Sequence, residues 1–548
     1  MISSLELVLS LDDADDTQKQ RAQAATLLQV APESVREIRI RRRSLDARRA
    51  PIRLRLLCDV WVDEDAPPEV MANIEYSIFD ANANAANGNS SNVRARKTVV
   101  IVGCGPAGMF AALELLRHGI KPIILERGKD VQSRRRDLAQ LTRAGIVDAD
   151  SNYCFGEGGA GTYSDGKLYT RVKDKKAIRE TLETLVAHGA PADILIEAHA
   201  HIGSNLLPKV VQAMRETILK NGGEIRFDSR VTDFLIQSQR MRGVVLQDGQ
   251  EIVADATILA SGHSGREIFG FLQSHGVLMA PKSFAIGVRI EHPQPAIDAI
   301  QYRHASFEKR ANGEWRHPKL PAASYRLAHE VEGRGVFSFC MCPGGWIVPS
   351  ATRGDEIVVN GMSLSRRDSP FANSGLVVSV ETEDLHGYES HGALAGMFFQ
   401  REIETRARIA AGNAPQNGQV APAQRVVDFL KNRVSPTLPP CSYKPGISSV
   451  SMSEVLPESI ARRLKTGLES FGRQMRGYLC DDALLVGVET RTSSPVRVPR
   501  EENRQHPQIA GLFPCGEGAG YAGGIVSAAI DGTRSAAACA ANLEYSIA

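Results

Sequence analysis

The segment SFCMCPGGW at positions 338–346 carries two cysteines one residue apart, Cys340 and Cys342, before a Pro-Gly-Gly turn signal. In a strand, residues i and i+2 share a face, but their Cα atoms lie about 6–7 Å apart, at the edge of disulfide reach. The pair could be a redox dithiol, half of a metal site, or a strand that leads into a turn. A metal site needs about four ligands. Since the sequence has no other CxC and no CxxC pair, we expect no metal site.

Two interpretations of this cysteine pair stay open. A reactive thiol that faces a substrate or cofactor needs an electropositive setting, and Cys342 is the candidate for that role. A buried strand position is the alternative, because free cysteine is among the most buried residue types. The choice depends on what the rest of the chain places beside the two sulfur atoms.

Lys167 and Arg491 are the other candidates for chemistry. Lys167 lies in the glycine-rich segment GEGGAGTYSDGKL and could stabilise negative charge on a substrate or cofactor. A turn ion pair with Asp165 is the alternative, since Ser-Asp-Gly suits a turn. Arg491 lies in GVETRTSSPVRV and could bind an anionic substrate in a bidentate manner. A structural ion-pair network is the alternative there.

The strongest element signal is a glycine-rich turn of the pattern GxGxxG, formed by Gly103, Gly105 and Gly108. It follows an expected strand at 98–102 and opens an expected helix whose apolar residues recur at helical spacing. A second expected strand at 122–125 ends in Glu126, 23 residues after Gly103. Two later matches to the same glycine pattern lack this strand, helix, strand and acid context, so only the first one predicts a dinucleotide site.

Each residue of this turn has a physical role in such a site. Gly103 allows the tight turn, Gly105 lets a pyrophosphate approach the backbone, and Gly108 lets helix and strand pack closely. The N-terminus of the helix offers free N–H groups and a partial positive charge to phosphates. Glu126 can accept hydrogen bonds from both ribose hydroxyls, and its charge disfavours a 2′-phosphate.

Two more segments, GQEIVADATILASGHSG (249–265) and GLFPCGEGAGYAGGIVSAAIDGTRSAAACA (511–540), complete a recognisable pattern. With GCGPAG and LERG they resemble the FAD-binding domain of the two-dinucleotide-binding flavoprotein superfamily. The resemblance implies non-covalent FAD, a ribityl contact at Glu517, and an adenine contact from the backbone of Val231. The cofactor-binding candidates are Gly103, Gly105, Pro106, Ala107, Gly108, Glu126, Arg127, Gly159, Gly161, Val231, Ser261, Gly262, Gly516, Glu517, Gly523, Gly524 and Ile525. His263, in the same turn region, is either a general base or a hydrogen-bonding loop histidine.

The resemblance becomes closer in four other stretches, which are RRRSLDAR (41–48), FGEGGAGTYSDGKLYTR (155–171), SFCMCPGGWIVPS (338–350) with NGMSLSRRDSPFANSG (360–375), and GVETRTSSPVRVPR (487–500). They are similar to the bacterial uncharacterised FAD-dependent dehydrogenases of the NAD/FAD-utilizing type, which have an N-terminal βαββ-like domain. This implies an oxidoreductase with no settled substrate. The chain lacks a second βαβ unit for NAD(P)H. Electrons would therefore come from the substrate, from NAD(P)H bound directly over the flavin, or from a redox partner protein.

The expected fold class is α/β, with a Rossmann-like FAD-binding domain, an inserted mixed α/β substrate domain and a small N-terminal βαββ-type module. The Asn-, Ala-, Gly- and Ser-rich residues after position 80 cannot build a core and indicate a linker. The expected boundaries are 1–79 for the N-terminal α+β module, 80–94 for the linker, 95–280 and 478–548 for the two parts of the FAD-binding domain, and 281–477 for the inserted domain.

Bulk composition limits the partners. The net charge of +2 provides no field that would recruit nucleic acid or membrane. No apolar run approaches the roughly 18–20 residues that span a bilayer, and the N-terminal sequence lacks a basic signal-peptide region. Nine cysteines, an odd number, fit reduced thiols better than a disulfide framework. These features predict a cytoplasmic protein with no membrane span, whose oligomeric state the sequence does not give.

The expected function is hydride transfer between flavin N5 and an unidentified small-molecule substrate. The alternative is an FAD-containing RNA-modifying or RNA-binding protein that uses an Arg-rich strand face, on which Arg39, Arg41 and Arg43 share one side. Without stacking aromatic residues nearby, a solvated face or a domain seam explains these arginines better. We therefore do not expect nucleic acid as a partner.

Overall fold

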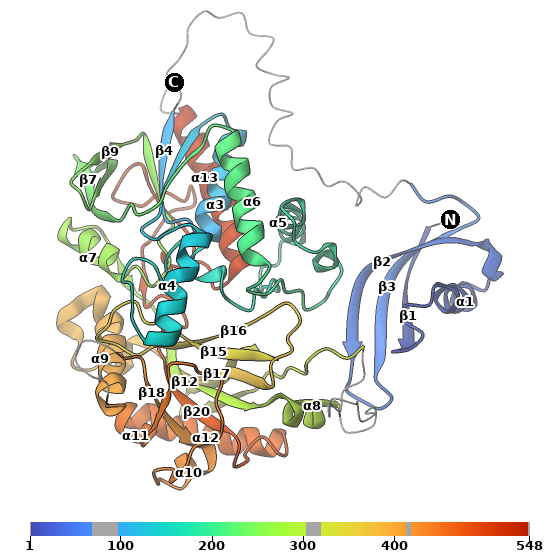
Figure 1. The fold of residues 1–548 in the computed structure, drawn as a ribbon. Coiled ribbons are helices and arrows are strands. Elements are labelled where there is room, and N and C mark those ends of the chain that lie inside the picture. Colours follow the sequence, from blue (N-terminus) through green and yellow to red (C-terminus); the bar gives the residue numbers. More distant parts are fainter. Residues whose placement is uncertain (1, 68–96, 303–318, 413–417, 546–548) are drawn as a thin grey trace, which may run out of the picture.

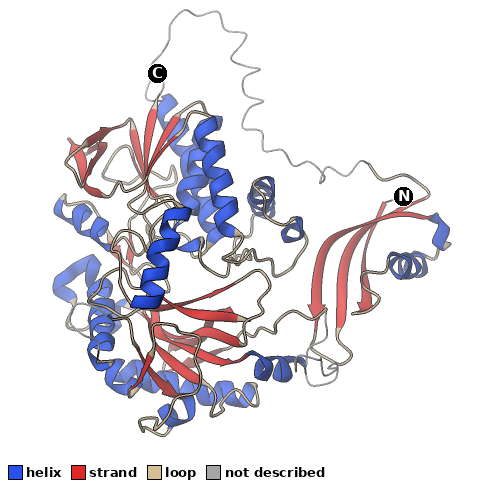
Figure 2. Cartoon of the chain, viewed as in Figure 1, coloured by secondary structure: helices blue, strands red, loops and turns tan. Residues whose placement is uncertain are grey.

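The computed structural model describes residues 2–67, 97–302, 319–412 and 418–545. Figure 1 shows a small N-terminal module beside a larger body, in which the remaining elements gather. Figure 2 shows that the body contains separate sheets flanked by helices, as an α/β protein requires. The expected linker at 80–94 lies outside the described residues.

The N-terminal module is a three-stranded antiparallel sheet with one helix, and its strand order is β1-β3-β2. Its elements are β1 (Ile2–Ser10), α1 (Thr17–Leu28), β2 (Val35–Asp46) and β3 (Arg53–Val62). Asp16 caps α1 by accepting two backbone N–H bonds, which satisfies donors that the first helical turn leaves free. The βαββ order is as predicted, although β2 continues to Asp46, so the turn comes later than the expected 44–47.

The N-terminal module contacts the body through β2. The backbone N–H of Arg43 donates to the Ile196 carbonyl at 2.8 Å, and the Arg43 carbonyl accepts from Ala198 N–H at 3.0 Å. The three arginines of the predicted face are ion-paired: Arg39 with Glu37, Arg41 with Asp59, and Arg43 with Glu197. This arrangement is that of a strand face and domain seam, and none of these ion pairs favours the RNA alternative.

The first sheet of the body is a five-stranded parallel sheet in the order β22-β10-β4-β5-β6. Its strands are β4 (Thr98–Val102), β5 (Lys121–Leu125), β6 (Glu224–Arg226), β10 (Ala256–Leu259) and β22 (Leu512–Pro514). Helices α3 (Pro106–Arg117), α6 (Leu207–Lys220) and α13 (Ile525–Tyr545) pack together on one face. The central strands are continuous apolar runs because both faces are covered.

The other face of this sheet is covered by a three-stranded sheet and by α7 (Arg266–Ser274). The three strands are β7 (Val231–Gln237), β8 (Arg240–Leu246) and β9 (Glu251–Val253). Helices α4 (Val131–Ala144) and α5 (Lys175–Ala187) complete this half of the body. Segments 97–280 and 511–545 thus form one Rossmann-like domain from two distant parts of the chain.

The second large sheet has seven strands in the order β13-β14-β17-β12-β20-β18-β19. These strands are β12 (Phe284–Pro293), β13 (Ala328–Val331), β14 (Arg334–Cys342), β17 (Phe371–Val380), β18 (Ala421–Arg425), β19 (Ile447–Ser449) and β20 (Leu484–Glu489). A hairpin of β15 (Gly345–Pro349) and β16 (Val359–Ser363) lies next to this sheet. The short strands β11 (Ala280–Pro281) and β21 (Val496–Arg497) pair with each other.

Helices α8 (Gln294–Tyr302), α9 (Ala395–Ala410), α10 (Val426–Leu430), α11 (Met452–Val455) and α12 (Glu458–Gln474) surround the seven-stranded sheet. Within the described ranges, no helix has the length and apolar character needed to cross a membrane. All nine cysteines lie in those ranges, and none of them forms a disulfide.

One expected boundary differs from the sheet topology. The predicted boundaries assign β20 to the second part of the FAD-binding domain, which begins at residue 478 in that prediction. Instead, β20 lies between β12 and β18 in the seven-stranded sheet. All six of its residues are buried, so it needs a neighbour on each edge. The chain returns to the parallel sheet only at β22.

Candidate active site

The predicted glycine-rich turn lies between β4 and α3. Gly103 has φ +105°, a conformation that side-chain-bearing residues rarely adopt. A Cβ on Gly108 would lie 2.0 Å from the Gly103 carbonyl oxygen, so only glycine fits where helix and turn meet. Gly105 is the N-cap of α3, and Pro106 is its first residue. The backbone therefore has the geometry that the sequence pattern predicts.

Most of the predicted cofactor residues converge on this turn. A Cβ on Gly159 would lie 3.2 Å from the Gly105 Cα, and one on Gly516 would lie 3.0 Å from the Ala107 side chain. Gly161 faces Ile525, the first residue of α13. A second group of close approaches involves Ser261 with Gly103, and Gly262 with Gly518. The structure thus brings four distant loops to the N-termini of α3 and α13.

Open space remains at the centre of this convergence. A Cβ added at Gly105, Gly262, Gly523 or Gly524 would meet no protein atom within 4 Å. Gly105 caps the N-terminus of α3, and Gly524 directly precedes that of α13. Such ends attract anions and favour negative charge. The residues present therefore fit a dinucleotide, whose pyrophosphate would be held at the N-terminus of α3.

Glu126 is buried at the end of β5, where its carboxylate accepts three backbone N–H bonds. Oε2 accepts from Cys104 at 2.9 Å, while Oε1 accepts from Gly128 and Gly156, both at 2.9 Å. A carboxylate offers about four acceptor sites, so capacity for a ribose hydroxyl remains. Glu126 therefore also holds the loops that surround the cofactor space, and its ribose contact stays a prediction.

Three other cofactor candidates have different surroundings. Arg127 pairs with Asp150 at 2.7 Å and stacks over Phe155, so its guanidinium orders the loop that follows β5. Val231 is buried at the start of β7. Glu517 lies 3.4 Å from the Nδ1 atom of His263. The direct cofactor contacts of Arg127, Val231 and Glu517 therefore stay predictions.

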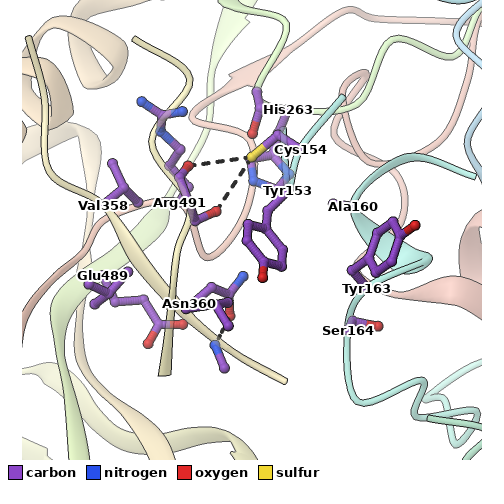
Figure 3. Close-up of a pocket in the computed structure, with 15 residues that line it drawn as sticks. Tyr153, Cys154, Ala160, Tyr163, Ser164, His263, Val358, Asn360, Glu489 and Arg491 are labelled. Carbon is purple, nitrogen blue, oxygen red and sulfur yellow. Dashed lines mark hydrogen bonds between the residues drawn. The ribbon is translucent and has the colours of Figure 1, made fainter. Parts of the chain in front are cut away.

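A cavity of about 40 Å³ opens where the FAD-binding loops meet the β15–β16 hairpin and the end of β20. Figure 3 shows Tyr163 and Ser164 on one side, Asn360, Glu489 and Arg491 on the other, and Tyr153 between them. The lining also includes Cys154, Ala160, His263, Ser264, Val348, Ser350, Val358, Val359 and Gly361. The cavity combines residues from both halves of the body, and many of its lining groups are polar.

Glu489, at the end of β20, is a buried acid on the wall of this cavity. Arg289 Nη1 donates to its two oxygens at 3.0 and 3.1 Å. Burial raises the pKa of Glu489 to about 7, although the Arg289 charge opposes that shift. Arg289 itself is fully buried and also donates to Asn373 at 2.9 Å. Glu489 can therefore hold or release a proton near neutral pH.

The Glu489→Gln variant is expected to flatten the pH dependence of stability. A carboxyl whose folded-state pKa is raised stabilises the protein at low pH, and this contribution is lost as pH rises through about 7. Between pH 5 and 8, the free energy of unfolding of the wild type should fall by up to about 3 kcal/mol. The variant should not show this fall. Urea unfolding across this pH range measures the difference. The control is Glu469→Gln, at an exposed acid on α12. If it flattened the pH dependence as much as Glu489→Gln does, the dependence would not arise from Glu489.

Sequence reasoning missed Arg289, although a signal for it exists. The residue lies in the middle of FAIGVRIEHP, where apolar residues surround it on a central strand. A charged side chain in such a run must be buried, and a buried charge requires partners. The partners lie on other strands, 51 to 200 residues away in the sequence. Local patterns could have found Arg289 but not Glu489 as its counter-ion.

Lys167 and Cys342, two of the predicted catalytic residues, lie together. The Nζ atom of Lys167 is 3.8 Å from Cys342 Sγ, 3.7 Å from Cys340 Sγ and 3.7 Å from Asp165. The ion pair with Asp165 that was one alternative for Lys167 is present. Its role toward a substrate or cofactor stays a prediction. The strand and turn expected at SFCMCPGGW are β14 and its connection to β15.

Arg491, the third predicted catalytic residue, forms ion pairs with two protein carboxylates. Its Nη2 lies 2.5 Å from Glu356 and 3.0 Å from Glu404, and its Nη1 donates to Thr352 at 2.9 Å. Its side chain is 4% exposed. Arg491 borders the cavity, but these ion pairs favour the structural network over substrate binding. Its role toward an anionic substrate stays a prediction.

Comparisons with known proteins agree with this architecture. Residues 96–266 match an FAD binding domain, residues 283–492 match the C-terminal domain-like region of FAD-dependent proteins, and residues 1–61 match a domain of unknown function. With the glycine turn and the open space beside it, these matches identify FAD as the cofactor. The fold and the site define a flavoprotein of the oxidoreductase class.

The family follows from a near full-length relative. An uncharacterized protein of Clostridium beijerinckii is 40% identical over 532 residues, which is 96% of each chain. The chain described here belongs to that family of FAD-dependent proteins. A flavin-dependent monooxygenase of Mycobacteroides abscessus is 26% identical over 175 residues, or 31% of this chain and 35% of that protein.

Two solved structures are remotely similar. CtdE in complex with FAD is 12% identical with a TM-score of 0.29, covering 80% of this chain and 82% of that one. A geranylgeranyl bacteriochlorophyll reductase-like protein from Thermoplasma acidophilum is 11% identical with a TM-score of 0.32, covering 82% and 80%.

Proposed function

We propose that this protein is an FAD-dependent oxidoreductase that binds a small-molecule substrate in the cavity beside Glu489 and transfers a hydride between that substrate and the flavin. The observation that carries the proposal is the position of the cavity. FAD-binding loops form one wall, the β15–β16 hairpin forms most of the other, and a buried acid from the end of β20 reaches it. Bound FAD supplies a two-electron carrier at flavin N5.

The side chains around the cavity have separate tasks in this proposal. Glu489 moves a proton to or from the substrate, because a group with a pKa near 7 is well matched to both directions at neutral pH. Arg289 holds the Glu489 carboxylate in place through two hydrogen bonds. Tyr153 and the half-buried Asn360 offer hydrogen-bonding groups that orient a polar substrate.

The electron donor is testable without the substrate. NAD(P)H bound directly over the flavin is the proposed external donor, because the matched domains include no separate nicotinamide-binding domain. Anaerobic addition of NADH or NADPH should bleach the long-wavelength flavin band of the purified holoprotein. Free FAD in the same buffer controls for non-enzymatic reduction.

Two outcomes contradict parts of this proposal. If dithionite bleaches the band and neither nicotinamide does, then a redox partner or the substrate itself supplies the electrons. If the holoprotein contains FAD that no reductant reduces, the flavin does not act as an electron carrier and the hydride-transfer proposal fails. A cytoplasmic location stays a prediction that cell fractionation can test.

A further inference from the structure

The CxC segment on β14 has an irregular backbone that gathers its two sulfur atoms. Pairing with β17 is regular at Phe339 and resumes at Cys342, and one extra residue lies between these points. Cys340 has φ +47°, a left-handed conformation that is uncommon for residues with side chains. Such bulges re-aim side chains and are common next to active sites. This bulge places both sulfur atoms within 3.8 Å of the Lys167 Nζ atom.

The charges around the pair favour a thiolate. Lys167 approaches from the FAD-binding loop, and Arg289 Nη2 donates to the Cys340 carbonyl at 2.9 Å and lies 3.7 Å from Cys342 Sγ. The nearest acid, Asp165, is itself paired with Arg367 at 2.5 Å. Arg289 is in turn paired with Glu489, whose charge also acts on Cys340. Three cations and two acids therefore surround the two thiols, which leaves a net charge of one positive unit. This is the electropositive setting that reactive cysteines require.

The two thiols differ in pKa and in solvent exposure. The hydrogen bond with Cys342 lowers the pKa of Cys340 well below its usual range, and the charges of Lys167 and Arg289 add to that shift. The same bond and burial raise the pKa of Cys342. Cys340 is partly exposed, whereas Cys342 is fully buried at 0%. Cys340 is thus placed to react with a molecule from solvent, and Cys342 lies buried beside it.

We propose that Cys340 and Cys342 form a thiol–disulfide exchange site for a small-molecule disulfide, in which Cys340 is the nucleophile and Cys342 the resolving thiol. The Cys340 thiolate attacks one sulfur of the ligand, whose S–S bond breaks and whose second half leaves as a thiolate that takes a proton from water. Cys342 then loses its proton to solvent and attacks the Cys340 sulfur, which releases the first half. The ligand disulfide is reduced to two thiols, and the protein pair is oxidised to a disulfide.

Lys167 is a positioning residue in this site. Its ammonium lies nearly equidistant from both sulfur atoms, at 3.7 and 3.8 Å, so it can stabilise the charge as the charge passes from one cysteine to the other. Excess low-molecular-weight thiol returns the protein disulfide to the dithiol by the reverse exchange. The site goes beyond the proposed hydride transfer, because its reaction needs neither the flavin nor the cavity substrate.

An aromatic disulfide, dithiobis-nitrobenzoate, tests the proposal on the FAD-loaded protein. At about pH 6, where ordinary thiols of pKa about 8.5 react slowly, the wild type should release one equivalent of thionitrobenzoate in a fast phase. A second equivalent should follow more slowly as Cys342 resolves the mixed disulfide, so that no adduct is retained. The Cys342→Ser variant should release one equivalent and keep a mixed disulfide at Cys340, visible by peptide mass. The Cys340→Ser variant should lose the fast phase.

Further variants separate this chemistry from a structural role. Lys167→Met should slow the fast phase by about tenfold and shift its pH profile upward, and Lys167→Arg should restore much of both. Cys480→Ser is the matched control, since Cys480 is partly exposed but burial raises its pKa, so the fast phase should not change. A fast phase that persists in Cys340→Ser, or a Cys342→Ser protein that keeps no adduct, would overturn the proposal, whatever the flavin does with NAD(P)H.

Discussion

The Gly105→Asp variant is expected to purify folded but without FAD. Gly105 is the N-cap of α3, with φ −78° and ψ −175°, an extended conformation that any residue adopts. A Cβ at this position meets no protein atom within 4 Å. Aspartate is among the preferred N-cap residues, and its charge complements the helix dipole. The free protein should therefore keep its stability or gain up to about 1 kcal/mol.

The same carboxylate would occupy the space assigned to the pyrophosphate. It would compete for the N–H groups of the first turn of α3 and place a like charge beside the phosphates. Two unit charges about 4 Å apart repel by about 4 kcal/mol near a protein surface, which corresponds to about a thousandfold in affinity. The ratio of flavin to protein absorbance after purification, followed by titration of the apoprotein with FAD, measures this loss.

Two matched variants isolate the charge and the position. Gly105→Asn has nearly the same size and the same capping ability without the charge, so its loss of affinity should be smaller. Gly270→Ala adds a Cβ to another open position, in the middle of α7, and should bind FAD like the wild type while stabilising the helix by up to about 1 kcal/mol. Stoichiometric FAD in Gly105→Asp would show that the pyrophosphate does not lie at this helix end.

The elements that the sequence predicted well share a physical basis. The strand, turn, helix, strand and acid from Thr98 to Glu126 lie within one short segment, and steric rules alone require glycine at Gly103 and Gly108. Such features depend on neighbours in sequence. They could therefore be predicted from the residues themselves. The convergence of the later loops was instead implied by the family resemblance.

The candidate site was harder to predict because its geometry depends on long-range pairing. The bulge that aims Cys340 arises where β14 pairs with β17, and nothing within SFCMCPGGW indicates that an extra residue will be accommodated there. The partner of Arg289 lies 200 residues away, on β20. The same pairing explains the misplaced boundary at residue 477, since a short apolar strand shows burial but not which sheet it joins.

The Glu404→Gln variant is expected to lose much of the stability of the folded protein. Glu404 is fully buried on α9 and accepts two hydrogen bonds from Arg266, both at 2.7 Å. Arg491 donates to the same carboxylate at 3.2 and 3.0 Å. These bonds join α7 of the FAD-binding domain to α9 and to the segment that follows β20. Removing one partner of a buried ion pair typically costs about 3–5 kcal/mol, because the other charge is left uncompensated.

Glutamine keeps the shape of the side chain but removes the charge and one acceptor. Its amide NH₂ group would face a guanidinium, so a donor would meet a donor. The control is Glu402→Gln on the same helix, where the side chain is 51% exposed and pairs with Arg406 at 2.6 Å. An exposed pair of this kind contributes about 0.5 kcal/mol or less. Urea unfolding in excess FAD compares the two variants with cofactor stabilisation held constant.

The pH dependence of this penalty distinguishes a charge effect from a packing defect. Burial alone would raise the pKa of Glu404, but the charges of Arg266 and Arg491 outweigh burial and lower it. A carboxyl with a lowered pKa stabilises the folded state above the ordinary carboxyl pKa of about 4.3, and that contribution is lost as pH falls through the folded value. The difference between the wild type and Glu404→Gln should therefore be largest at neutral pH and shrink in acid. A difference that stays constant with pH would assign the loss to packing instead.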